Sequence, residues 1–193
     1  MIIVFDVEAT DLNPGQICQF SYLMAEGGEV TGRNYYFAVD EMSEGSREVH
    51  RLDREALEAL SGGERFEDRA EGILADFARA QRWVGHNVAF DERYLRVELE
   101  RCGLKAPKAQ TFCTMNFFTA AMGMERKVRT GRPKPPKLEE LAAHFGVTAE
   151  AAQALSAAAF GGGGDQHDAR YDAAVTYLCL EAATRAGAVR GIL

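Results

Sequence analysis

The sequence predicts an α/β fold built on five strands. Residues 2–8 carry apolar side chains on both sides of an extended stretch, as a central strand does when other elements cover both faces of its sheet. Residues 17–25 and 34–39 are typical of two further strands, and the Gly27-Gly28 pair between them favours a hairpin or meander with the first strand. Two short apolar runs later in the chain, each followed by a helical pattern, supply the remaining strands.

The first strand ends in a D-x-E pair. Asp6 and Glu8 are two residues apart, so their carboxylates project from the same face of the strand, with Cα atoms roughly 6–7 Å apart. Two like charges at the end of a buried strand repel each other, and a cation between them relieves the repulsion. A lone D-x-E is more often a pair of surface acids at the end of a strand, so this pair needs support from other motifs.

A helical region follows the meander. Asp53 is placed to cap one short helix, and residues 67–79 carry apolar side chains at helical spacing. His50 comes just before this region, where a single histidine is more often a hydrogen-bonded loop residue than a working one.

The stretch from Trp83 to Asp91 predicts a strand, a turn and the start of a helix that runs to about Cys102. If this helix begins near Asn87, the helical spacing puts five residues on one inward face. These residues are Asn87, Phe90, Asp91, Tyr94 and Leu95. A carboxylate on that face loses several kcal/mol of hydration unless a cation or hydrogen-bond donors replace the water. The chain must therefore supply a partner for Asp91.

The second half of the chain predicts a strand and a series of helices. Residues 111–114 form the fifth strand, and the helices cover residues 115–124 and 138–145, a stretch that begins at Thr148, and residues 173–186. His144, on the second of these helices, is expected to be structural. The glycines at 161–164 break the helical pattern.

His167 and Asp172 follow these glycines. On one helix, five residues separate two side chains by about 140°, so the two could not serve one site. The conflict disappears if His167 lies in the loop or first turn and Asp172 lies inside the last helix. A flexible linker with an ordinary helix cap at Asp168 explains this segment equally well.

The formal net charge of −7 argues, taken alone, against non-specific binding to nucleic acid. Residues 126–137, however, contain six Lys or Arg, no acid and three prolines, which predicts an extended basic loop. The loop could contact a phosphate backbone or could simply be solvated, and the sequence leaves both readings open.

The length of 193 residues fits a single domain over residues 1–193. No apolar run approaches the roughly 18 residues of a membrane span, and residues 1–6 have no basic leader. The four cysteines are scattered without a C-x-x-C pair, which argues against a zinc knuckle or a disulfide framework. We therefore expect a protein of the reducing cytoplasm.

Three motifs occur in order along the chain: D-x-E on the first strand, H-N-x-x-F-D at the second strand-to-helix turn, and H-x-A-x-x-D at the last helix. In this order they resemble the DEDDh-type 3′-to-5′ exonucleases, the family that contains the proofreading subunit of DNA polymerase III, ribonuclease T and oligoribonuclease. The matching residues are Asp6, Glu8, Asp91, His167 and Asp172. A sister subgroup carries tyrosine four residues before the last aspartate, where this chain has Asp168.

The resemblance extends from Ile3 to about Leu180, and two departures stand out. Relatives often follow D-x-E with Thr-Gly-Leu, whereas this chain has Thr10-Asp11-Leu12, which puts the turn and its nucleotide contact in question. Residues 49–52 only loosely resemble the His-Gly-Ile-Thr segment of many relatives.

The resemblance implies a ribonuclease H-like fold: a mixed five-stranded sheet, with three antiparallel strands, two strands parallel to the first, and helices on both faces. It further implies two divalent cations, Mg²⁺ or Mn²⁺, held by Asp6, Glu8, Asp91 and Asp172. Hard oxygen ligands suit these ions, and four ionised carboxylates balance two dications. His167 would take the proton of the attacking water. Thr10, Leu12, Asn87 and Phe90 are candidates for substrate binding or site support.

The expected function is a metal-dependent 3′-to-5′ exonuclease that releases nucleoside 5′-monophosphates, with DNA favoured. An RNA-trimming enzyme and a catalytically silent nucleic-acid-binding module of the same fold are the alternatives. The expected partner is the 3′ end of a single-stranded nucleic acid, with a homodimer or a polymerase partner left open.

Overall fold

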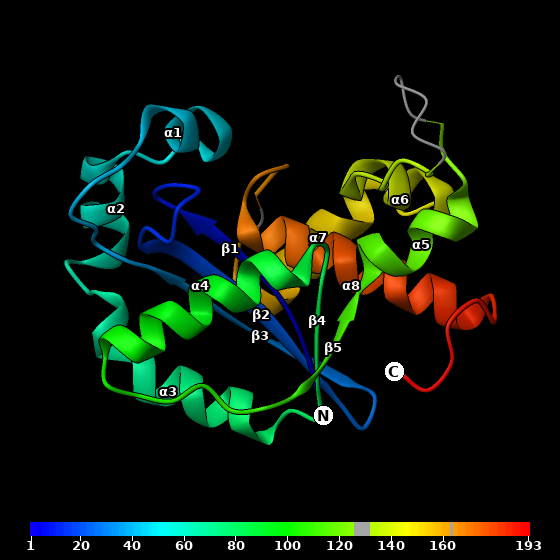
Figure 1. Ribbon diagram of the computed structural model, residues 1–193, viewed down its shortest axis with the longest axis horizontal. Helices are drawn as coiled ribbons and strands as arrows, with labels where there is room; N and C mark the ends of the chain where they lie inside the picture. The colour runs from blue at the N-terminus through cyan, green and yellow to red at the C-terminus, as the bar shows by residue number, and fades with distance from the viewer. Residues whose placement is uncertain (126–131, 163) are drawn as a thin grey trace.

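The computed structural model describes residues 1–125, 132–162 and 164–193. Within these ranges the strands form one mixed five-stranded sheet of order β3-β2-β1-β4-β5, with helices on both faces (Figure 1). β1 pairs antiparallel with β2 and β2 with β3, whereas β4 and β5 run parallel to β1. The strands are β1 (Ile2–Ala9), β2 (Ile17–Glu26), β3 (Glu29–Tyr36), β4 (Arg82–Gly85) and β5 (Gln110–Cys113). This arrangement confirms the ribonuclease H-like α/β fold.

The helices alternate with the later strands. In the described part of the chain they are α1 (Glu44–His50), α2 (Arg54–Ser61), α3 (Phe66–Arg79), α4 (Val88–Arg101), α5 (Thr114–Met122), α6 (Leu138–Phe145), α7 (Ala149–Phe160) and α8 (Ala169–Arg185). Each of these helices is too short or too polar to cross a lipid bilayer.

β1 lies at the centre of the sheet because its side chains enter two different cores. Ile3, Phe5 and Val7 pack with residues of α3 and α4 in an aromatic-rich core, whereas Ile2 and Val4 pack with residues of α8 on the opposite face. Burial of one such side chain contributes about 1.5–3 kcal/mol. Packing on both faces therefore fixes the position of β1 and of the acids at its carboxyl end.

The β2–β3 hairpin has the tight turn that Gly27-Gly28 predicts. Both glycines have positive φ, 61° and 87°, which favours glycine in a two-residue hairpin turn. Pairing consequently begins at once, with Glu26 opposite Glu29. The prediction of a strand at 34–39 is wrong at both ends, because β3 starts earlier and residues 37–39 form a buried connection beyond the ladder.

The α1 helix is absent from the sequence prediction, which places His50 in a loop. Ser43 caps this seven-residue helix by accepting a hydrogen bond from Ser46 N, and the helix ends at His50. Gly45 and the lack of apolar spacing hide it in the sequence. His50 is buried, and its Nδ1 accepts a hydrogen bond from Leu52 N.

The elements of the second half lie within one or two residues of their predicted bounds, except for α8. This helix begins at Ala169, before the apolar-rich stretch at 173–186, because Asp168 caps it and accepts a hydrogen bond from Arg170 N. Asp172 therefore lies inside the helix, as the sequence predicts. Of the predicted basic loop, residues 126–131 lie outside the described residues, and residues 132–137 have no regular structure. Lys134 and Lys137 form ion pairs with Glu140 and Glu139 of α6.

Candidate active site

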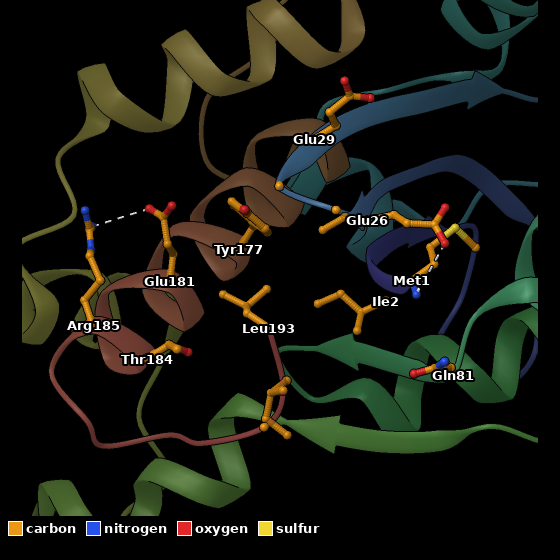
Figure 2. A pocket seen from close by; sticks show the side chains of 15 residues that line it. Met1, Ile2, Glu26, Glu29, Gln81, Tyr177, Glu181, Thr184, Arg185 and Leu193 are labelled. Atoms are coloured by element: carbon orange, nitrogen blue, oxygen red, sulfur yellow. Dashed lines mark ion pairs between the residues drawn. The ribbon is translucent and has the colours of Figure 1, made fainter.

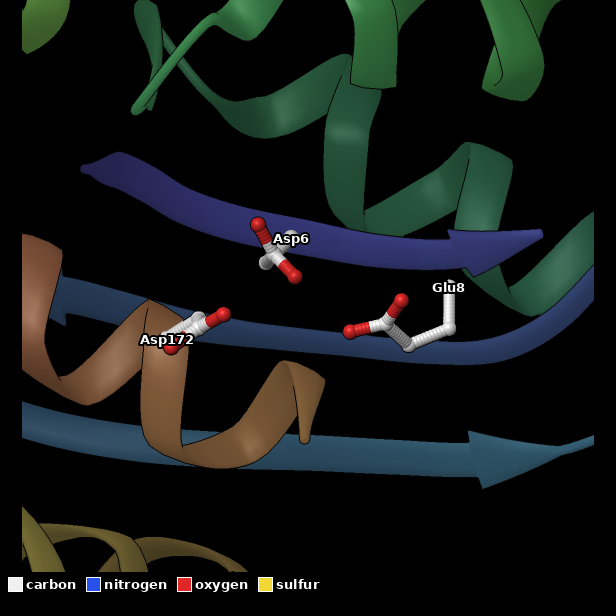
Figure 3. A group of neighbouring side chains, drawn as sticks. All are labelled: Asp6, Glu8 and Asp172. Atoms are coloured by element: carbon white, nitrogen blue, oxygen red, sulfur yellow. The ribbon is translucent and has the colours of Figure 1, made fainter. Parts of the chain in front are cut away.

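Three acids from opposite ends of the chain meet beside β1. Asp6 and Glu8 project from the carboxyl half of β1, and Asp172 lies in the first turn of α8. One carboxylate oxygen from each of the three residues lies within 4.8 Å of the others (Figure 3). The spacing of two along the strand places both strand acids on the same face, as the sequence predicts, and in the structure this face is turned toward α8.

Asp91 approaches the same segment of β1 from α4. The side chain is only 3% exposed, and its Oδ1 accepts a hydrogen bond of 3.3 Å from the backbone N–H of Val7, between Asp6 and Glu8. The predicted inward orientation of Asp91 is thus confirmed. Asp91 does not belong to the tight group of three oxygens, but its charge acts on Asp6.

The close approach of α4 to β4 favours a glycine at position 85. A Cβ atom at Gly85 would lie 3.1 Å from Cβ of Val88 and 3.3 Å from Oδ2 of Asp91. Contacts this short force a neighbouring atom to move. The glycine of the strand-to-helix turn therefore lets Asp91 reach the sheet.

The four acids have raised pKa values. Burial, followed by the charges of Asp91 and Asp172, raises the pKa of Asp6, and burial followed by Asp172 raises that of Glu8. Burial raises the pKa of Asp91 to about 8 and that of Asp172 to about 7. Full ionisation of the group near neutral pH therefore needs additional positive charge.

Divalent cations fit this group of acids. Every donor is a carboxylate oxygen, the hard ligand that Mg²⁺ and Mn²⁺ prefer. Within the described ranges no lysine or arginine forms an ion pair with Asp6, Glu8, Asp91 or Asp172. The acidic group is therefore compatible with divalent metal binding.

His167 lies outside α8, as the angular argument requires. It precedes the helix cap, has a left-handed backbone with φ of 67°, and is exposed. Burial raises the pKa of Asp172, and a hydrogen bond from the His167 backbone partly offsets that rise. His167 and Asp172 line the same hollow of about 380 Å³, which is bordered on its other side by the start of α6.

A hollow of about 400 Å³ opens beside Glu8 and is lined mainly by apolar atoms. Leu12, which is 78% exposed, and Phe90 line it, together with Val49 and His50 of α1. The contribution of α1 was missed by the sequence analysis, because that helix carries no periodic signal.

Thr10 and Asn87 occupy different settings. Thr10 is buried, and its hydroxyl and carbonyl oxygens accept hydrogen bonds from the backbone N–H groups of Gln16 and Ser43. Thr10 therefore supports the loop that carries Leu12. The prediction that Asn87 shares the inward face of α4 is wrong, because Asn87 has a φ of 78°, lies before the helix and is exposed.

His86 is a supporting residue that the sequence analysis did not single out. Its Nδ1 lies 3.0 Å from Oγ1 of Thr114, and its Nε2 lies 3.0 Å from the carbonyl oxygen of Pro136. The histidine of the H-N pair thus ties the β4–α4 turn to the start of α5 and to the segment before α6. The sequence of this pair does not indicate which distant residues the histidine contacts.

Another hollow, of about 610 Å³, lies at the amino end of β1 (Figure 2). It is bordered by Met1, the β2–β3 turn and the last turns of α8, where Glu181 and Arg185 form an ion pair of 3.4 Å. The acidic group lies at the opposite end of the strand. In open α/β sheets, ligands bind at the carboxyl ends of the strands. The chemistry is therefore expected at the acids.

The fold and the site together define a ribonuclease H-like protein with an acidic group suited to divalent cations. The RNase_T exonuclease family model matches residues 3–180, and the chain belongs to this exonuclease family of the DEDDh type. Members of this family are 3′-to-5′ phosphodiester hydrolases. A comparison with curated proteins finds no significant match.

Solved structures of exonuclease I are similar in fold. E. coli Exonuclease I in complex with a dA16 oligonucleotide superimposes with a TM-score of 0.72 at 16% identity, over 95% of this chain and 40% of that one. Its complex with a dT13 oligonucleotide superimposes with a TM-score of 0.73 at 15% sequence identity, over 95% of this chain and 40% of that one. A product-bound structure of exonuclease I superimposes with a TM-score of 0.72 at 16% sequence identity, over 95% of this chain and 43% of that one. The chain thus spans about two fifths of the length of these relatives.

Proposed function

We propose that residues 1–193 form one exonuclease domain that removes nucleotides from the 3′ end of single-stranded nucleic acid, with DNA favoured, and releases nucleoside 5′-monophosphates. The observation that carries the proposal is the grouping of the Asp6, Glu8 and Asp172 oxygens within 4.8 Å in a member of an exonuclease family. The burial of Asp91 beside them supports it.

In this proposal Asp6, Glu8, Asp91 and Asp172 hold two divalent cations, Mg²⁺ or Mn²⁺. When bound, such cations stabilise negative charge on the attacking and leaving oxygens of an in-line displacement at phosphorus. The carboxylates would bind and orient the cations, and the Val7 N–H bond keeps the Asp91 side chain directed at β1.

His167 is the proposed general base. Its position outside α8, its exposure and the hollow that it shares with Asp172 support this role. An imidazole suits this task because its ordinary pKa lies near neutral pH.

The hollow beside Glu8 is the proposed site of the terminal nucleotide. Leu12 and Phe90 offer apolar surface for a base, Thr10 holds the Leu12 loop in place, and Asn87 is exposed at the β4–α4 turn. DNA is favoured because E. coli Exonuclease I, which shares the fold, forms complexes with DNA oligonucleotides. An RNA-trimming activity stays the second candidate, because recognition of the 2′-hydroxyl depends on details of these contacts.

Digestion of oligonucleotides tests this function. We expect a 5′-labelled single-stranded DNA to shorten from its 3′ end in Mg²⁺ or Mn²⁺, to release 5′-mononucleotides, and to stay intact with a chelator. Duplex DNA and RNA of the same sequence serve as comparison substrates, and faster loss of RNA would move the assignment to RNA trimming.

The Asp6→Ala variant is the matched control, and it should be inactive at every Mg²⁺ concentration because a shared ligand is gone. Binding of the oligonucleotide by the wild type without any degradation would identify a catalytically silent binding module instead.

A further inference from the structure

A buried amide connects the sheet to the start of α8. Gln19 lies on β2 opposite Glu8, and it is only 1% exposed. Its Nε2 donates hydrogen bonds to Oδ1 of Asn34 on β3, at 3.1 Å, and to Oδ1 of Asp168, at 2.9 Å. Its Oε1 accepts a hydrogen bond of 3.3 Å from the backbone N–H of Ala169. One side chain therefore holds both the cap and the first residue of the helix.

Asp168 is a fifth acid near the site, but its setting differs from that of the other four. Nε and Nη2 of Arg170 donate to its two oxygens at 2.9 and 2.6 Å. Burial acts to raise the pKa of Asp168, but the hydrogen bonds from Arg170 and Gln19 outweigh burial and lower it. The Arg170 guanidinium also lies over the Tyr36 ring, 5.8 Å from its centroid. The carboxylate charge is thus balanced inside the protein.

The position of Asp168 in the sequence links this contact to the proposed chemistry. It directly follows His167, whose backbone is left-handed. Its carbonyl oxygen accepts a hydrogen bond of 3.0 Å from the N–H of Asp172, one helical turn later. A movement of the helix cap would therefore displace His167 and Asp172 together, relative to Glu8 on the neighbouring strand.

We propose that Gln19, Asp168 and Arg170 form a positioning group that sets the Asp172 carboxylate and the His167 imidazole against Glu8. This inference rests on the proposed function, because it takes those residues as the site. The three residues support the groups that bind and react, and they do not themselves contact substrate or cation. Loss of such a supporting contact around a metal site typically costs about 10- to 100-fold in metal affinity or activity.

Gln19→Glu is the main test, because it keeps the shape of the side chain and places a carboxylate against Asp168. We expect kcat to fall about 10- to 100-fold, with KM for a single-stranded oligonucleotide little changed. Mn²⁺ binding measured by calorimetry without substrate should weaken in the same variant. A merely structural substitution would lower thermal stability and leave Mn²⁺ affinity and kcat of the folded protein unaltered.

The double variant Gln19→Glu with Asp168→Asn restores one amide and one carboxylate across the same contact. We expect it to recover part of the lost kcat and Mn²⁺ affinity, which a double-mutant cycle would record as coupling. Recovery stays partial because Asp168→Asn also removes one of the two oxygens that accept hydrogen bonds from Arg170. Arg170→Lys keeps the charge but loses the paired hydrogen bonds, and it should lower kcat in the same direction by a smaller factor.

Glu181→Gln is the matched control, because it breaks an exposed ion pair at the far end of the same helix. It should behave as the wild type does. A folded Gln19→Glu variant with wild-type kcat and Mn²⁺ affinity would overturn the positioning role. If that variant does not fold, wild-type values in Arg170→Lys would overturn it. A wild type that leaves every oligonucleotide intact would instead refute the proposed exonuclease.

Discussion

Some residues of this protein belong to the acidic group, and others hold those acidic side chains in position. Asp91 illustrates the first kind. It is almost fully buried, and a backbone N–H of β1 supplies one of the hydrogen bonds that replace its water. The sequence predicts this burial because Asp91 shares its helical face with Tyr94 and Leu95, which are fully buried. Asn87 shows the limit of the same argument, since the helix starts one residue after it.

The His167→Ala variant tests the proposed base at the residue scale. We expect the single-turnover rate at pH 7 to fall by roughly 10²- to 10⁴-fold, because proton transfer from water loses its acceptor. Affinity for a single-stranded oligonucleotide should change little, since the acids are untouched. Rates measured with excess enzyme, together with binding curves in Ca²⁺, separate the two quantities. An unchanged rate at pH 7 would remove His167 from the base role.

At the scale of secondary structure, local signals predicted most elements. The caps at Asp53 and Thr148 mark the starts of α2 and α7, because each side chain accepts a hydrogen bond from the helix backbone. Prediction failed at residues 37–39, which are buried as strand residues are but do not pair with a neighbouring strand. It also failed for α1, a short helix that lacks apolar residues at helical spacing. The Gln19–Asp168 contact lay beyond prediction because it joins residues 149 positions apart.

The β4–α4 junction supplies a prediction at this scale. Gly85→Ala should lower the free energy of unfolding by about 1–3 kcal/mol, because the new methyl group crowds Val88 and Asp91. The substitution should also weaken Mn²⁺ binding, since α4, which carries Asp91, must move to make room for the methyl group. Gly72→Ala in α3 is the matched control: its Cβ would meet no atom within 4 Å, and the substitution should stabilise the helix by about 0.5–1 kcal/mol. Urea unfolding and calorimetry measure both effects, and equal stability of the two variants would contradict the crowding argument.

At the scale of the whole molecule, the acidic group opposes the stability of the fold. The chain carries a net charge of −7, and four of its carboxylates lie in or beside one partly buried group. Such a concentration of like charge is costly in the free protein and is relieved by protons or cations. Stability of the metal-free protein should therefore depend on pH through these residues, and added Mg²⁺ should compete with the protons.

The sign of this dependence follows from the raised pKa values of Asp91, about 8, and Asp172, about 7. Between the unfolded pKa, near 4, and these values, the folded protein binds more protons than the unfolded chain, so its stability falls as pH rises. The slope reaches about 1.4 kcal/mol per pH unit for each group. Burial lowers the pKa values of His50 and His86, so below neutral pH these histidines make stability rise with pH. The fall in stability caused by the two aspartates is therefore clearest between pH 7 and 8.

Urea unfolding in chelator across this window should give a falling free energy of unfolding, and Mg²⁺ should raise the value most at pH 8, where protons compete least with the cation. Asp91→Asn should flatten the metal-free slope, because the amide does not titrate, and should also reduce the stabilisation by Mg²⁺. A metal-free stability that rises from pH 7 to 8 would mean that these carboxylates are ionised in the folded protein without a cation. The requirement for divalent ions would then lose its electrostatic basis.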